Sequence, residues 1–123
     1  MEPILMMKTS LALLTITALG GVAMAIIRLG RDANPPSWLA MLHGLLAGSA
    51  LTLLLYAYFT VGLPALAGWG LLLFLAAAAG GVYLNLGYHA KAMPLPKGIV
   101  VGHAAIAVAG YVLLLVAVLA PPR

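Results

Sequence analysis

Four long apolar stretches, separated by short segments that contain proline, glycine or charge, dominate the pattern of the sequence. We expect helices over residues 9–27, 38–58, 69–88 and 98–119. Each has close to the roughly 20 apolar residues that an α-helix needs to cross the hydrocarbon core of a bilayer. The pattern therefore predicts an all-α membrane protein whose four transmembrane helices form a bundle.

The segments between these stretches contain residues that favour turns and end helices. The first connection includes Asp-Ala-Asn-Pro-Pro at 32–36, and proline cannot continue a helix. Ser37 follows as the expected N-cap of the second helix. The second connection, 60–68, has no charge, whereas the third, 89–97, is basic and contains two prolines. Connections this short leave little chain for a soluble domain.

The composition strengthens the membrane interpretation. Of the 123 residues, 65% are hydrophobic and 7% are charged, whereas a soluble domain carries about 25% charged residues. So few charges cannot cover a surface that faces water, so we expect residues 1–123 to form a single transmembrane domain in the lipid bilayer. Residues 1–8 are expected to be a short tail. With no cysteine, thiol chemistry and thiolate-held clusters are excluded.

The net charge of +4 comes from six basic residues that lie near the helix ends. Such a distribution is typical of topology signals and lipid headgroup contacts, and we expect no nucleic acid partner. Arg28, Arg31, Lys91 and Lys97 lie on the first and third connections. The positive-inside tendency therefore predicts that these connections face the cytoplasm, in a bacterial inner (cytoplasmic) membrane, although Lys8 argues for the opposite orientation.

The second half of the chain repeats the first at an offset of sixty residues without a gap. The matched residues that are rare enough to matter are Gly20 and Gly80, Gly21 and Gly81, Pro36 and Pro96, and His43 and His103. We therefore predict two helical hairpins, at about 8–60 and about 68–120, that arose by duplication. An even number of spans separates the copies, so a pseudo-twofold axis along the membrane normal should relate them.

The matched histidines are the main candidates for chemistry. His43 and His103 lie about 7–9 Å inside the second and fourth helices, and ionisable groups inside spans are functional candidates by default. If both side chains turn inward, they face each other across the bundle axis. Haem b takes axial imidazoles from two opposite sides, and facing helices of a bundle commonly hold cofactors. We therefore predict one haem b, with His43 and His103 as the ligands of its iron.

Small and basic residues at the same level fit this hypothesis. The residues expected to leave a slot for the flat ring are Gly20, Gly21, Gly80 and Gly81. The residues expected to reach the haem propionates are Arg28, Arg31, Lys91 and Lys97. Glycines in spans also serve simple tight packing, and an intramembrane histidine can simply bond a neighbouring helix. Zinc or copper would need further ligands, and no carboxylate lies within a span.

Two further polar residues lie near the third connection. His89 has Leu29 as its counterpart in the repeat, so it breaks the symmetry. We interpret His89 as an interfacial residue, with contact to a quinone headgroup or a propionate as the alternative. Asn85, an amide within a span, is expected to bond another helix or to line the same pocket.

In its layout, with histidines on paired helices of four, the chain resembles the small four-helix membrane cytochromes b, without a signature motif. Two-haem members of that class have four ligand histidines, and only His43 and His103 match them here. The resemblance implies electron transfer through one haem, to or from a quinone or a partner redox subunit.

Two other functions remain open. One is an accessory or structural subunit of a larger membrane complex without its own cofactor, and the chain is compatible with a homo- or hetero-oligomer. The other is a small transporter of the multidrug-resistance type, which relies on an intramembrane glutamate. Here the only acids are Glu2 and Asp32, both outside the spans. With no nucleophile–base pair in the sequence, we expect no independent catalytic activity.

Overall fold

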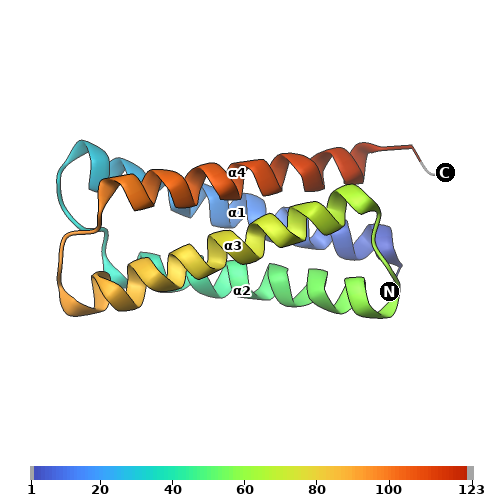
Figure 1. Ribbon diagram of the computed structural model, residues 1–123, viewed down its shortest axis with the longest axis horizontal. Coiled ribbons are helices and arrows are strands. Elements are labelled where there is room, and N and C mark those ends of the chain that lie inside the picture. Colours follow the sequence, from blue (N-terminus) through green and yellow to red (C-terminus); the bar gives the residue numbers. More distant parts are fainter. Residues whose placement is uncertain (1, 122–123) are drawn as a thin grey trace.

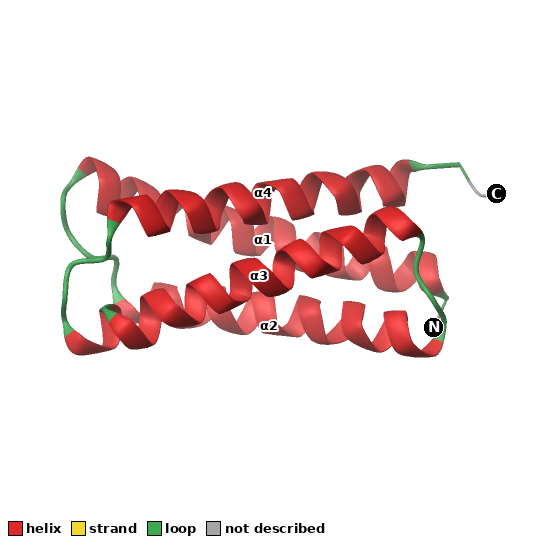
Figure 2. Ribbon diagram, viewed as in Figure 1, coloured by secondary structure: helices red, strands yellow, loops and turns green. Residues whose placement is uncertain are grey.

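The computed structural model describes residues 2–121, which form four long α-helices and one short 3₁₀ turn. The helices are α1 (Pro3–Gly30), α2 (Ser37–Thr60), α3 (Ala65–Gly87) and α4 (Lys97–Leu119), and the 3₁₀ turn η1 covers His89–Lys91. The four helices lie side by side and run in alternating directions (Figures 1 and 2). Each is long and apolar enough to cross a membrane, by length and composition. The prediction of an all-helical chain with four such helices is confirmed.

The helix ends differ from the predicted ones. α1 begins at Pro3, so most of the expected tail is helical, because a proline at the first position of a helix lacks only an N–H that would have had no partner. Ser37 is the first residue of α2 and does not cap it. Pro36 occupies the N-cap position instead, and its carbonyl accepts the N–H groups of Leu39 and Ala40.

Each hairpin is joined by a close contact between small residues. In the first hairpin, the Ser10 hydroxyl donates to the carbonyl of Ala50 at 3.3 Å. In the second, a Cβ on Gly70 would lie 3.0 Å from the carbonyl oxygen of Gly110. Gly70 and Gly110 are the sixty-residue counterparts of Ser10 and Ala50, so both hairpins pack closely at matching positions, as small residues allow.

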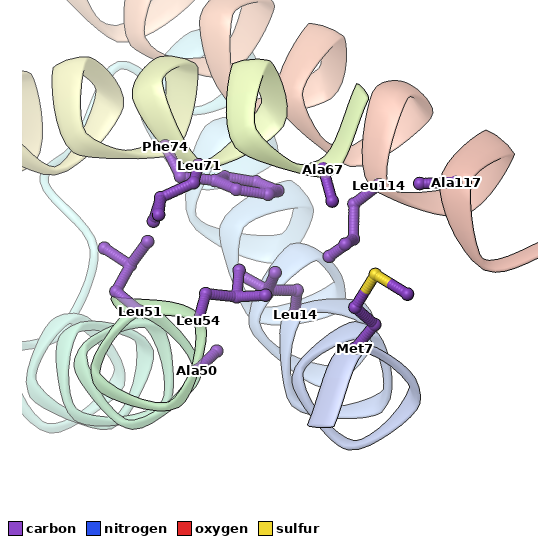
Figure 3. Close-up of a cluster of buried hydrophobic side chains, with 10 residues drawn as sticks. All are labelled: Met7, Leu14, Ala50, Leu51, Leu54, Ala67, Leu71, Phe74, Leu114 and Ala117. Carbon is purple, nitrogen blue, oxygen red and sulfur yellow. The ribbon is translucent and has the colours of Figure 1, made fainter. Parts of the chain in front are cut away.

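The main cluster of buried apolar side chains lies in one half of the molecule, and Figure 3 shows its members in close-up. Its residues are Met7, Leu14, Ala50, Leu51, Leu54, Ala67, Leu71, Phe74, Leu114 and Ala117. All come from the halves of the helices that lie toward the termini and the second connection. In the other half, the described residues of α2 before Ala50 and of α4 before Gly110 include none that is buried. At that end α1 and α3 still bury Thr17, Arg28, Ala77 and Leu84, but with nothing buried from α2 and α4 this half is loosely filled.

The first and third connections lie together at the loosely filled end, opposite both termini (Figure 1). The side chain of Asn34 donates to the carbonyl of Met93 at 2.8 Å and accepts the N–H of Leu95 at 3.0 Å. The His89 Nε2 lies 2.8 Å from the carbonyl oxygen of Pro35. These bonds tie the two hairpins to each other at this end.

We expect Gly70→Ala to destabilise the protein by about 1–3 kcal/mol, because its Cβ would overpack the contact with Gly110. The measurement is the free energy of unfolding in detergent. The matched control is Gly102→Ala, since a Cβ at Gly102 meets nothing within 4 Å and alanine favours a helix by about 1 kcal/mol over glycine. Equal stability of the two variants would contradict the close hairpin contact.

Candidate functional site

The structure brings the matched histidines of α2 and α4 together. α2 and α4 lie diagonally opposite, because each packs against both α1 and α3. From these opposite helices His43 and His103 turn inward, and their ring centroids are 6.2 Å apart with the ring planes at 64°. The side chains therefore face each other across the centre of the four helices, in the loosely filled half.

Both imidazoles are held in the same way. The Nδ1 of His43 lies 2.9 Å from the carbonyl oxygen of Thr17, and the Nδ1 of His103 lies 2.7 Å from that of Ala77. A carbonyl can only accept, so each Nδ1 carries the hydrogen and donates it. Each Nε2 is left with its lone pair, which is the state in which imidazole binds a metal ion.

A glycine makes each of these bonds sterically possible. A Cβ on Gly21 would lie 3.1 Å from Cε1 of His43, and a Cβ on Gly81 would lie 3.2 Å from Cε1 of His103. Gly21 follows Thr17 by four residues, so in an α-helix it lies directly over the carbonyl that His43 reaches. Gly81 has the same relation to Ala77. The absence of a side chain therefore exposes each carbonyl to a second donor.

The other two glycines of the pairs have different surroundings. A Cβ on Gly80 would lie 3.7 Å from Nδ1 of His103, whereas one on Gly20 would meet only Leu39, at 4.0 Å. Three of the four predicted slot glycines thus border an imidazole. Their direct contribution is to the placement of the histidine rings.

A cavity of about 110 Å³ lies between the hairpins next to the histidines. Its walls consist of six pairs of residues, each pair sixty positions apart, and one unmatched residue, Val108. The pairs are Leu14 and Phe74, Thr17 and Ala77, Ala18 and Ala78, His43 and His103, Ala47 and Ala107, and Leu51 and Tyr111. Each hairpin therefore contributes the same set of positions, and the walls are mostly small or apolar.

Tyr111 is the polar exception to this symmetry. Its hydroxyl lies 2.7 Å from Oγ1 of Thr15, and Thr15 donates to the carbonyl of Leu11 at 2.8 Å. Neither residue was predicted from the sequence, although a tyrosine eight positions after His103, on the same face of the helix, was a usable signal. Thr17 and Ala77 were not predicted either, because they act through backbone carbonyls and carry no side-chain signal.

Two of the four predicted propionate-binding cations already have a partner. Arg28 is buried and donates from Nε to the carbonyl of Leu95 and from Nη1 to Asp32, both at 2.8 Å. Lys97 pairs with the same carboxylate at 2.9 Å. The hydrogen bonds from Lys97 and Arg28 hold the pKa of Asp32 below its ordinary value.

The remaining predicted polar residues lie at the same end. Arg31, Lys91 and Asn85 are exposed, and His89 is bonded to the first connection rather than directed at the cavity. Among the described residues, no group of three or more His, Cys, Asp or Glu side chains is placed to hold a metal ion. Within the described residues, the two facing imidazoles thus have no third side chain of these types beside them.

Comparison with protein-family models, with curated proteins and with solved structures finds no match for this chain.

The hydrogen bonds of the three histidines predict one tautomer for His43 and His103 and the other tautomer for His89. In ¹⁵N-histidine-labelled protein without added ligand, we expect His43 and His103 to carry the proton on Nδ1 and His89 to carry it on Nε2. Gly21→Ala should shift the ring resonances of His43, because its Cβ displaces that ring. Gly44→Ala, where a Cβ meets nothing within 4 Å, is the control and should leave them unchanged. Nε2-protonated rings at His43 and His103 would contradict the observed bonds.

Proposed function

We propose that this protein is a membrane b-type haem protein, that His43 and His103 are the two axial ligands of one haem, and that its function is electron transfer. The observation that carries the proposal is the pair of imidazoles facing each other across the helices, with each Nε2 left free. The absence of a third ligand fits haem, whose porphyrin supplies the other four donors, better than a bare metal ion.

The spacing of the rings supports this assignment. A metal–imidazole nitrogen bond is about 2 Å long, and ring bonds of about 1.35 Å put each nitrogen about 1.1 Å from the ring centre. Two imidazoles on opposite sides of one metal ion therefore have centroids about 6 Å apart. The separation of His43 and His103, 6.2 Å, matches this value.

The surroundings of the rings also suit ligands. A metal-bound histidine usually donates its other N–H to a carbonyl or a carboxylate, which fixes the ring orientation and raises the basicity of the ligand nitrogen. Thr17 and Ala77 supply these carbonyls from helix backbones. The positions of both ligands are thus defined before any metal arrives.

The volume of the cavity is a stricter test of whether the protein can hold a haem. The cavity of about 110 Å³ is smaller than the roughly 300–1,000 Å³ of typical ligand pockets, so a porphyrin requires the side chains around the cavity to shift aside while the two imidazoles keep their separation. The half of the molecule that holds the histidines is the half in which α2 and α4 bury no residue. The packed core at one end and the bonds of Asn34 and His89 at the other can keep the hairpins together while these side chains rearrange.

When bound, haem would supply a one-electron iron couple, and with both His43 and His103 holding it the iron would be suited to electron transfer rather than to reactions at an open site. Leu14, Phe74 and the alanines of the cavity exclude water. Arg31 and Lys91 are exposed near the same end and provide positive charge for carboxylates there. Arg28 and Lys97 would first have to leave Asp32.

The wider proposal is a bundle of four transmembrane helices, built from a duplicated hairpin, in a bacterial inner membrane with the first and third connections in the cytoplasm. The matched histidine–carbonyl bonds and the matched hairpin contacts at Ser10 and Gly70 support the duplication. The four basic residues of the predicted cytoplasmic side all lie at the end where these connections meet, which supports the orientation.

One observation favours a second candidate, an accessory subunit without its own cofactor. Both histidines already bond a neighbouring helix through Nδ1, and such bonds are enough to explain histidines that serve packing alone. Haem content separates the two candidates.

Protein purified from haem-replete cells should show a Soret band that sharpens on reduction, with one haem per chain. We expect His43→Ala and His103→Ala each to lower haem content at least about tenfold, because one axial ligand and its preorganised bond are lost. His89→Ala, whose ring bonds the first connection, is the matched control and should keep its haem. A haem-free wild type, or equal haem content in all three variants, would refute the proposal.

A further inference from the structure

The seam between α1 and α4 differs from its counterpart between α2 and α3. At the α1–α4 seam the hydroxyls of Thr15 and Tyr111 meet on the exposed surface, while the ring of Tyr111 also lines the cavity. Val108, which lies beside them on α4, lines the cavity and is 62% exposed. The cavity therefore reaches the outer surface of the helices at this seam.

The polar pair of Thr15 and Tyr111 has no polar counterpart in the sequence repeat. The positions that correspond to Thr15 and Tyr111 are Leu75 and Leu51, so the equivalent seam has two apolar side chains. Leucines can thus fill these positions in the same fold. The hydroxyls of Thr15 and Tyr111 bond each other and the carbonyl of Leu11, so they are tolerated in this apolar seam, but the fold does not require them there.

The direction of the hydrogen bonds shows what the seam offers to a ligand. Thr15 donates its only hydroxyl hydrogen to the carbonyl of Leu11. Tyr111 must therefore be the donor in its bond to Thr15. The phenolic oxygen of Tyr111 keeps acceptor capacity and has no hydrogen left to give, so the seam is an acceptor for a hydroxyl group.

We propose that the α1–α4 seam binds the hydroquinone headgroup of a lipid-soluble quinol, with a quinol hydroxyl donating to Tyr111. The ligand must arrive through the bilayer, must carry a hydroxyl donor and must fit beside apolar side chains such as Val108. Of membrane-soluble molecules with these properties, quinols are the ones that exchange electrons, so this choice of ligand rests on the proposed haem function. The oxidised quinone has carbonyls in place of hydroxyls and finds no donor at Tyr111.

The test is the relative affinity for a decyl-tailed benzoquinol and the matching benzoquinone, titrated calorimetrically into protein in phosphatidylcholine nanodiscs. We expect wild type to bind the quinol about tenfold more tightly, the equivalent of one hydrogen bond. Tyr111→Phe should abolish this preference. Tyr83→Phe is the matched control, because Tyr83 has an exposed hydroxyl contact with Tyr88 outside the cavity wall, and it should bind as wild type does.

The Thr15→Val variant is the most discriminating test, because it should reverse the binding preference. Without Thr15 as acceptor, the Tyr111 hydroxyl is free to donate, so the preference should change from quinol to quinone. Thr15→Ser keeps the hydroxyl and should bind as wild type, which controls for folding. Equal affinities in wild type, no change in Thr15→Val, or equally tight binding of a decyl alcohol would each overturn the proposal. Haem content, measured on the same samples, separates these failures from a failure of the haem assignment.

Discussion

The arrangement of the site depends on one interaction that occurs twice, the bond from a histidine Nδ1 to a helix carbonyl that a glycine leaves uncovered. In the helix ladder each carbonyl already accepts the N–H four residues later, and a side chain at that later residue would keep a second donor away. Gly21 and Gly81 remove that obstacle. His43 and His103 can then reach across to α1 and α3, which fixes both rings and leaves a lone pair on each Nε2.

The uneven packing of the molecule follows from where the large side chains lie. Leu54, Leu114 and Phe74 fill the interior toward the termini, and the small contacts Ser10–Ala50 and Gly70–Gly110 draw each hairpin together there. Around the histidines the facing residues are alanine and glycine, so the hairpins meet with little buried side-chain volume. Hydrogen bonds of Asn34 and His89 close the far end. A packed core and a tied end thus enclose the loosely filled region around the histidines.

The sequence was sufficient for the four helices and for the common depth of the histidines. Apolar length predicted the helices, and the sixty-residue repeat placed His43 and His103 at the same depth. The sequence left open whether both side chains turn inward, because helices that are apolar all round show no inward face. It was not sufficient for the helix start at Pro3, since a tail and a first turn have similar composition. The pairing of Arg28 with Asp32 also escaped it. The four-residue spacing of the pair was a usable signal, but Asp32 lies beyond the end of α1 and has a left-handed backbone, φ 54°, so the helix spacing rule did not strictly apply to it.

The most direct test of the account is electron paramagnetic resonance of the oxidised protein, with nitrogen hyperfine spectra from ¹⁵N-histidine-labelled samples. One low-spin ferric centre per chain, coupled to one nitrogen from His43 and one from His103, is the result that the account predicts. A high-spin centre, coupling to a single histidine, or no iron signal in protein from haem-replete cells would contradict it.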